Sequence, residues 1–145
     1  MANAKDLVAK TVTSVHETLY RLSKGRVGGR GYGMPVVILT TTGRKSGQRR
    51  TTMLTSPVQD GDTVVLVASY GGDDRHPAWY LNLRKNPDVE LTWGSTTKPM
   101  RARVASKDEK AELWPRVVAV HKGYGQYQTR TTRDIPLVIL EPIAP

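Results

Sequence analysis

The sequence contains no cysteine among its 145 residues. Disulfides, thiolate metal sites and a cysteine nucleophile are therefore excluded. Histidine is scarce as well: His16, His76 and His121 are scattered, and His16-Glu17 lacks the second histidine of a zinc-protease motif, so we expect no metal. No stretch approaches the roughly 20 apolar residues of a membrane span, and no apolar run of signal-peptide length follows Met1. These absences favour a cytoplasmic protein.

Acidic residues are few, because 13 Asp and Glu stand against 22 Lys and Arg, giving a formal net charge of +9. This surplus predicts an anionic partner, which can be nucleic acid, acidic lipid or a polyanionic small molecule. The plain alternative is that the charge only maintains solubility. A chain of 145 residues is most simply one domain with a real core.

The first 34 residues predict an amphipathic helix followed by a glycine-rich loop. Val8, Val12, Val15, Leu19 and Leu22 recur at helical spacing over residues 5–22. Packing of this helix on the body of the domain is the favoured interpretation. The alternative is a peripheral contact with an anionic membrane, because basic residues flank the helix. The loop 25–33 lacks the G-x-G-x-x-G spacing of a dinucleotide site.

Residues 35–145 form the second predicted segment, which is rich in short antiparallel strands. We predict about six strands, at 36–42, 50–58, 63–69, 89–93, 98–105 and 135–140. Turns at 59–62 and 94–95 would join two hairpins, and Pro136 suggests that the last strand is an edge strand. Helices are predicted near 77–83 and after Ser106, where Ser106 and Glu109 match a capping box. The expected fold is mainly β (α+β), a six-stranded antiparallel split β-barrel with an N-terminal helix and short outer helices.

A basic turn follows the first buried strand, in the stretch PVVILTTTGRKSGQRR (35–50). Gly43 and Gly47 bracket the turn and allow unusual backbone geometry. Arg44, Lys45 and Arg50 supply cations, and Ser46 adds a hydroxyl, so the turn is suited to an anion, most plausibly a phosphate. The turn is not a P-loop, because it lacks the Walker glycine spacing.

A second feature lies where the strand 63–69 ends in Ser69-Tyr70-Gly71-Gly72, just before the helix that begins near Pro77. If the neighbouring strands are adjacent, both features face one groove. A phosphate at the first and a flat heterocycle at the second would suit an elongated cofactor. The alternative is that Gly71-Gly72 is an ordinary loop and Trp79 a core residue.

Four motifs resemble one known family. LTTTGRKSGQRR, VASYGG, HPAWYLNLRKNPDV and YQTRTTRDIPLVILEP occur in the order and spacing of the deazaflavin-dependent nitroreductase family. This family is the A branch of the flavin/deazaflavin oxidoreductases, which have a split β-barrel fold. The resemblance covers the chain from about residue 35 to 142. The chain departs from the family pattern at Met53, Tyr70 and His121.

The resemblance implies coenzyme F420, an 8-hydroxy-5-deazaflavin with a phosphate and an oligoglutamate tail. It implies that phosphate and tail contacts come from Arg44, Lys45, Ser46 and Arg50, and that the strand of Thr51, Thr52, Met53, Leu54 and Thr55 lies beside the cofactor. Backbone contacts to the rings would come from Val67, Ala68, Ser69 and Tyr70, with Ala78, Trp79, Tyr80, Leu81 and Asn82 closing over them. Tyr124 and Tyr127 resemble the tyrosines of the substrate pocket and are candidate proton donors, with water as the alternative donor.

The function implied is transfer of a hydride from reduced F420 to an electron-poor small molecule. Candidate acceptors are quinones, α,β-unsaturated esters, lactones or enones, and nitroaromatics. One alternative is a split-barrel protein that binds F420, FMN or haem without turnover. A nucleic-acid-binding barrel is disfavoured, because Trp93 is the lone aromatic residue on the predicted strands that could stack with bases. The sequence does not determine the oligomeric state.

Overall fold

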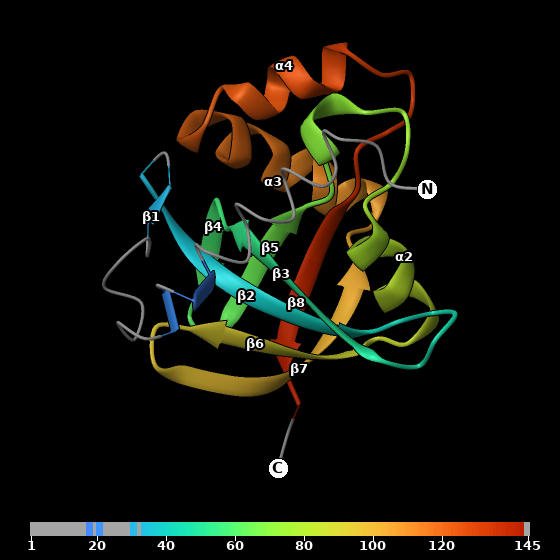
Figure 1. The fold of residues 1–145 in the computed structure, drawn as a ribbon. Helices are drawn as coiled ribbons and strands as arrows, with labels where there is room; N and C mark the ends of the chain where they lie inside the picture. Colours follow the sequence, from blue (N-terminus) through green and yellow to red (C-terminus); the bar gives the residue numbers. More distant parts are fainter. Residues whose placement is uncertain (1–16, 19, 22–29, 32, 144–145) are drawn as a thin grey trace.

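The computed structural model describes residues 17–18, 20–21, 30–31 and 33–143 (Figure 1). Its antiparallel strands are β1 (Arg30–Gly31), β2 (Met34–Thr42), β3 (Arg49–Thr55), β4 (Val58–Asp60), β5 (Thr63–Val67), β6 (Asp88–Trp93), β7 (Thr96–Val104) and β8 (Leu137–Pro142). The sheet order is β1-β2-β6-β7-β8-β5-β4, and β3 pairs with β2. β3, paired with β2, continues through Ser56-Pro57 into β4, which pairs with β5, so the chain links the two ends of the curled sheet.

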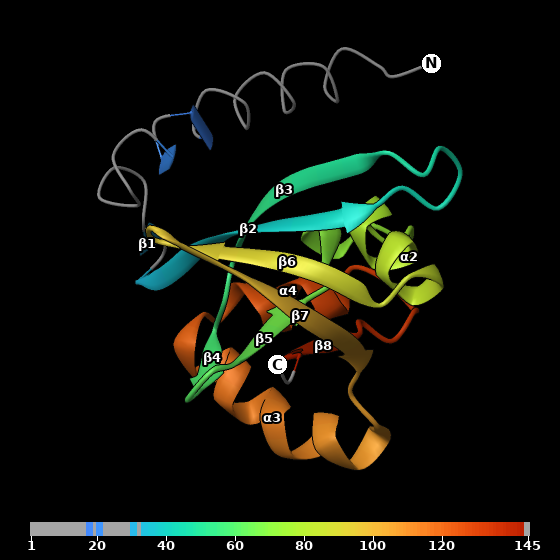
Figure 2. The ribbon, with the colours of Figure 1, turned by 90° about the horizontal axis from the view of Figure 1, so that it is seen from below.

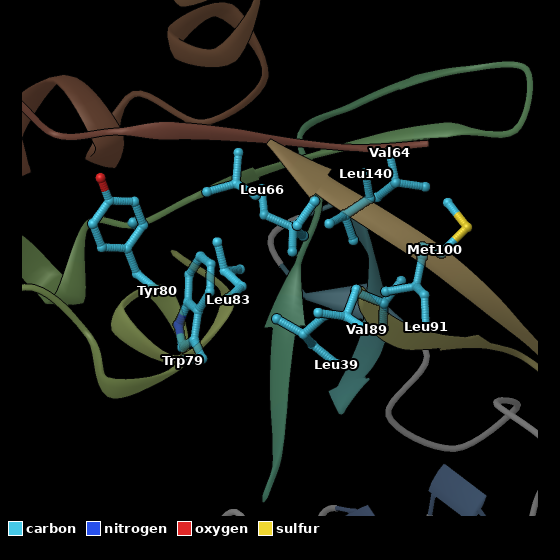
Figure 3. Close-up of a cluster of buried hydrophobic side chains, with 14 residues drawn as sticks. Leu39, Val64, Leu66, Trp79, Tyr80, Leu83, Val89, Leu91, Met100 and Leu140 are labelled. Atoms are coloured by element: carbon cyan, nitrogen blue, oxygen red, sulfur yellow. The ribbon is translucent and has the colours of Figure 1, made fainter. Parts of the chain in front are cut away.

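Alternation along β2 separates the inside of the barrel from its outside. Val37 and Leu39 belong to a buried cluster with residues of β5, β6, β7, β8 and α2 (Figure 3). Val36 and Ile38 belong to a different cluster on the opposite face of the strand. Leu39 lies opposite Thr52 of β3 and Leu91 of β6, so β2 is paired on both sides. A strand with apolar residues on both faces is expected where both faces are covered.

The predicted six strands are wrong in number, because the described residues contain eight. The strand predicted at 50–58 is broken at Ser56-Pro57, between β3 and β4. Ser56 is fully buried, and its hydroxyl donates to the carbonyl oxygens of Val58 (3.1 Å) and Val65 (2.8 Å). Its amide donates to Pro35 (3.0 Å). The buried serine thus lets the chain leave β2 and pair with β5. The short β1 was not predicted.

The prediction that β8 is an edge strand is also wrong. β8 pairs with both β5 and β7. Pro136 precedes the strand, where it needs no amide for the ladder, and its carbonyl accepts from the Ala68 amide (3.0 Å). Both predicted hairpins are confirmed, with Gly61-Asp62 and Gly94-Ser95 as the connecting residues.

Within residues 33–143, the α-helices are α2 (Ala78–Lys85), α3 (Lys107–Val120) and α4 (Gly123–Thr129), which lie outside the barrel. A 3-10 turn, η1 (Tyr70–Gly72), follows β5. The capping box is confirmed, since the Ser106 hydroxyl accepts from the Glu109 amide and the Glu109 side chain accepts from the Ser106 amide. Pro115 lies inside α3, which continues to Val120. Helix α4, which carries Tyr124 and Tyr127, was not predicted.

Helix α3 lies on the side of the barrel opposite β3 (Figure 2). Helices α3 and α4 pack on the outer face of β5 and β8. On the other side, Tyr20 is almost fully buried against Val36, Ile38 and Met53. Its hydroxyl accepts from the Gly94 amide (2.6 Å).

Most of the predicted helix 5–22 lies outside the described residues. The four residues of this stretch that the structure describes, 17, 18, 20 and 21, are helical. Most of the predicted loop 25–33 also lies outside the described residues. Among the described residues, no helix combines the length and the apolar character needed to cross a membrane.

Candidate active site

The turn between β2 and β3 is a closely bonded loop, which we call the basic loop (residues 43–48). The Gly43 amide donates to the Gln48 carbonyl (2.7 Å), and the Gly47 amide donates to the Gly43 carbonyl (2.9 Å). The Ser46 hydroxyl accepts from the Gln48 amide (3.1 Å). A Cβ atom on Gly43 would lie 2.7 Å from the Ser46 hydroxyl oxygen, and Gly47 has a φ of +72°. The two glycines are therefore required for this loop.

Helix α2 attaches the basic loop to the barrel through Asn82 and Lys85. The buried Asn82 Oδ1 accepts from the Arg44 amide (3.1 Å) and from Arg44 Nη1 (3.1 Å), while Asn82 Nδ2 donates to Thr41 Oγ1 (3.2 Å). Lys85 Nζ donates to the Arg44 carbonyl (2.8 Å). Asn82 and Lys85 are three residues apart, so they share one face of the helix. This face fixes the backbone of Arg44.

A hollow of about 460 Å³, the basic hollow, opens between the loop and the helix. It is lined by Thr42, Gly43, Arg44, Lys45, Ser46, Gly47, Lys85 and Asn86. Arg50 is close by, with its Cγ 3.7 Å from a Cβ placed on Gly43. Among the described residues, none of the salt bridges involves Arg44, Lys45, Arg50 or Lys85. Cations gathered without acidic partners create a positive potential that favours phosphate or carboxylate ligands.

The predicted ring-contact residues follow β5 and occupy a constrained loop. Val67, Ala68 and Ser69 are buried, whereas Tyr70 is 47% exposed and has a φ of +46°. Positive φ is unusual for a tyrosine and marks a strained backbone. Gly72 lies so close to α4 that a Cβ there would be 2.7 Å from the Tyr127 carbonyl oxygen. The loop is therefore pressed against the helix that carries the predicted substrate-pocket tyrosines.

Residues 51–55 of β3 divide between different surroundings. Leu54 packs on the barrel interior, and Met53 packs on the outer cluster beneath Tyr20. Thr51 is exposed, and its hydroxyl donates to Glu17 (3.3 Å), while Thr52 is half-buried. Thr55 Oγ1 lies 3.0 Å from the Tyr124 hydroxyl. Alternation along a strand means that these five side chains do not face one groove together.

The predicted covering residues on α2 are mostly core residues. Trp79 and Tyr80 are buried in the barrel cluster, in an edge-on arrangement with centroids 6.5 Å apart (Figure 3). Ala78 is exposed and Leu81 is half-buried. Trp79 and Tyr80 thus anchor α2, while Asn82 reaches the basic loop.

Three aromatic rings from α4 and the turn before it form a cluster. The ring centroids of His121, Tyr124 and Tyr127 lie 5.2 to 6.5 Å apart, in edge-on geometry. The Tyr124 hydroxyl also lies 3.7 Å from the Met34 sulfur. Burial raises the pKa of the Tyr124 phenol above its usual range, although the hydrogen bond with Thr55 acts in the opposite direction. Tyr124 therefore stays protonated near neutral pH, and its hydroxyl is already engaged.

Contacts among the described residues connect the basic loop, the loop after β5 and the aromatic cluster on α4 to neighbouring elements. Helix α2 contacts β2 near the basic loop, and α4 contacts η1 (Figure 1). Just before α2, at the end of the loop that follows β5, the His76 ring lies in a tilted arrangement with its centroid 4.7 Å from that of Tyr80. The part of the chain that the structure describes holds no group of three or more His, Asp or Glu side chains suited to a metal.

A model of the F420H(2)-dependent quinone reductase family matches residues 12–142. The chain belongs to this family. Membership implies reduced coenzyme F420 as the hydride donor and an F420-dependent reductase activity. The basic hollow fits this cofactor, because a phosphate and a run of carboxylates need several cations that no acidic side chain already neutralises.

Relatives of this F420H(2)-dependent quinone reductase family member cover most of its length. An F420H(2)-dependent quinone reductase of Mycobacterium tuberculosis strain H37Rv is 44% identical over 133 residues, which is 87% of each chain. The solved structure of an F420-H2 dependent reductase (FDR-A) is 40% identical with a TM-score of 0.67, over 74% of this chain and 94% of that chain. A structure described as a domain-swapped dimer is 34% identical with a TM-score of 0.71, over 96% and 100%. The likeness to FDR-A confirms the predicted split-barrel architecture.

Sequence reasoning missed two residues that this family member brings to the site. Lys85 lines the basic hollow, and the signal for it was its i,i+3 spacing from Asn82. Arg133 donates to the carbonyl oxygens of Ala68 and Ser69 across a separation of more than 60 residues. No local pattern could have identified that contact.

Proposed function

We propose that the protein transfers a hydride from reduced F420 to a quinone. The observation that carries this proposal is the basic hollow, in which Arg44, Lys45 and Lys85 lie without acidic partners among the described residues. Quinones are preferred as acceptors because the matching family and the mycobacterial relative are named for them. Unsaturated esters, lactones, enones and nitroaromatics remain acceptors to be screened.

In this proposal the basic loop binds the acidic end of the cofactor. Arg44 is pre-positioned by Asn82, so its guanidinium loses little freedom on binding a phosphate. Lys45, Ser46 and Arg50 are exposed and can reach the phosphate and the tail carboxylates. When bound, reduced F420 supplies a hydride, and the oxidation chemistry belongs to the cofactor.

The remaining residues orient the rings and the acceptor. Backbone groups of residues 67–70 would lie along the ring system, at the start of the turn η1. The aromatic cluster of His121, Tyr124 and Tyr127 forms one wall of the acceptor site and excludes water from it. Orientation of two reactants in this manner can lower the barrier by about 7–11 kcal/mol.

A proton must reach the reduced acceptor, and Tyr127 is the preferred donor. The Tyr124 hydroxyl is buried and already bonded to Thr55 (3.0 Å), so we assign Tyr124 to the wall. Tyr127 is half-buried, and no hydrogen bond among the described residues engages its hydroxyl. Water is the alternative donor.

The proposal is tested by binding and turnover measured with the same preparations. F420 is titrated at low ionic strength into the wild type and into the Lys45→Ala and Lys85→Ala variants. The matched control is Lys107→Ala, an exposed lysine at the start of α3. Each site variant should weaken binding about tenfold, as loss of one charged hydrogen bond predicts, and the control should bind as the wild type does.

Turnover is followed as the rise of oxidised F420 absorbance with a naphthoquinone, an enone or a nitroaromatic as acceptor. Oxidation that requires the quinone supports the proposal. Saturable F420 binding without turnover of any acceptor would favour the non-catalytic alternative. Absence of saturable F420 binding, or equal binding of FMN or DNA, would overturn the assignment altogether.

A further inference from the structure

One guanidinium, that of Arg133, binds both ends and the middle of the loop that follows β5. Arg133 Nη2 donates to the carbonyl oxygens of Ala68 (3.2 Å) and Ser69 (2.9 Å). Its Nε donates to the Asp73 carbonyl (2.9 Å), and its Nη1 lies 3.3 Å from His76 Nδ1. Because a guanidinium has no acceptor, His76 Nδ1 must be unprotonated and accept in this contact. We call residues 68–76 the strand-end loop.

The charge of Arg133 is used for geometry rather than for an ion pair. None of the salt bridges among the described residues includes Arg133. Its guanidinium instead has four acceptors, which are three backbone carbonyl oxygens and one imidazole nitrogen. A planar guanidinium has a fixed fork of donors, so it fixes the relative positions of the groups it binds. Arg133 is half-buried, which strengthens these contacts relative to exposed ones.

Two neighbours of Arg133 reinforce the same connection. Arg130 Nη1 donates to the Gly71 carbonyl (3.2 Å), and Thr131 Oγ1 donates to the Asp74 carboxylate (2.7 Å). Arg130 also lies over the Tyr127 ring, with its Cζ 5.5 Å from the centroid. The segment after α4 therefore joins the strand-end loop to the helix of Tyr124 and Tyr127.

We propose that Arg133 is a positioning residue. It holds the strand-end loop in a fixed position relative to α4, so that the ring system of F420 and the acceptor stay aligned. This inference rests on the proposed function, in which the loop contacts the rings and α4 forms the acceptor wall. None of the residues that Arg133 contacts lines the basic hollow. Its loss should therefore affect the transfer step more than affinity for the acidic end of F420.

The experiment compares Arg133→Met, Arg133→Lys and the wild type. Methionine keeps the unbranched stem of the side chain as far as the position of Nε but removes every donor, and lysine keeps one charged donor group. The matched control is Arg116→Met on α3, where an exposed arginine pairs with Asp60 (3.0 Å). Hydrogen exchange is read at the amides of Ala68, Gly72 and Asp73, whose native acceptors are Pro136, Ser69 and Tyr70. This arm requires no cofactor.

We expect exchange at these three amides to accelerate about tenfold or more in Arg133→Met, with the barrel strands unchanged, because the loop opens locally. The dissociation constant of F420 should stay within about threefold, while the single-turnover rate with a naphthoquinone falls by about 10- to 100-fold, as small misplacements predict. Arg133→Lys should recover part of the rate, and Arg116→Met should match the wild type.

Unchanged exchange in Arg133→Met would overturn the inference, as would faster exchange with an unchanged transfer rate, which would leave Arg133 a purely structural role. If Arg133→Met does not fold, the same two outcomes are read from Arg133→Lys. If the wild type itself fails to oxidise reduced F420, the proposed function fails, and the positioning role is lost with it even where exchange accelerates.

Discussion

Asn82 connects the barrel to the basic loop, so its substitution should have two separable effects. Asn82→Ala removes the hydrogen bonds to Thr41 Oγ1, the Arg44 amide and the Arg44 guanidinium. Asn82 is only 4% exposed, so water would not replace these bonds freely. Two neutral bonds at about 1 kcal/mol each and one charged bond at about 2 kcal/mol predict a loss of about 4 kcal/mol in the free energy of unfolding. The melting temperature should fall by roughly 10 °C or more.

Asn82→Asp separates charge from structure. The aspartate keeps the shape and the acceptor oxygen for Arg44, and the Thr41 hydroxyl can rotate to donate to it. Stability should therefore fall by only about 1 kcal/mol. The new negative charge lies beside the basic hollow and would repel the phosphate or carboxylates of F420. For two like charges about 4 Å apart, this repulsion costs between about 1 kcal/mol of binding free energy in water and about 4 kcal/mol at an effective dielectric constant of 20. Affinity for F420 should fall about tenfold or more at low salt.

The assays are chemical denaturation and F420 titration at low and raised ionic strength. Raised salt should reduce the difference in F420 affinity between Asn82→Asp and the wild type, because mobile ions screen exposed charges. The control is Ser95→Asp, which adds the same charge in the exposed turn between β6 and β7, away from the basic loop. If Asn82→Ala unfolds within about 0.5 kcal/mol of the wild type, or if both aspartate variants bind F420 equally, the role assigned to Asn82 is wrong.

Three further predictions concern other parts of the molecule. Tyr127→Phe should slow turnover and change the solvent isotope effect, whereas Tyr124→Phe should leave that isotope effect unchanged. If the two variants show the same turnover and the same isotope effect, water is the proton donor. Burial, with Arg133 and Arg84 nearby, lowers the pKa of His76, which also faces Tyr80, so folding favours the neutral imidazole. Stability should therefore be full above about pH 6.5 and decrease below it as the unfolded chain takes up the proton first, and His76→Gln should remove that part of the pH dependence. Tyr20→Phe should cost about 1 kcal/mol of unfolding free energy by removing the hydrogen bond from the Gly94 amide, and Tyr20→Ala about 3–5 kcal/mol; unchanged denaturation midpoints would contradict the observed packing.

Features that depend on neighbouring residues were predictable from the sequence. The capping box of α3 needs only Ser106 and Glu109, three residues apart, and it forms as predicted. The basic turn follows from two glycines around Arg44-Lys45-Ser46, and the loop closes through bonds within residues 43–48. The hairpins follow from glycine-containing turns between apolar strands.

Features that depend on distant residues were not predictable in this way. The break at Ser56-Pro57 is stabilised by Val65, which lies on another strand. Pro136 was expected at a sheet edge, but the strand it introduces is central, because the proline lies before the ladder begins. The contacts of Arg133 join residues 57 to 65 positions apart. Each of these outcomes is decided by tertiary packing, which overrides the local signal.

The clustering of cations at the basic hollow bears on the explanation of the net charge of +9. Among the described residues, Arg49, Lys98, Arg101, Arg103 and Arg116 each have a carboxylate partner on the surface of the barrel or its helices. Among the described residues, the four cations around the basic hollow (Arg44, Lys45, Arg50 and Lys85) have none, and cations elsewhere such as Lys107 and Arg133 have none either. A charge surplus that served solubility alone would not need four cations gathered at one loop, and one that served nucleic acid would extend along a strand face with stacking aromatics. Mutual repulsion makes four unpaired cations at one loop unfavourable by themselves, and the compact anion that we propose to bind there would offset that repulsion.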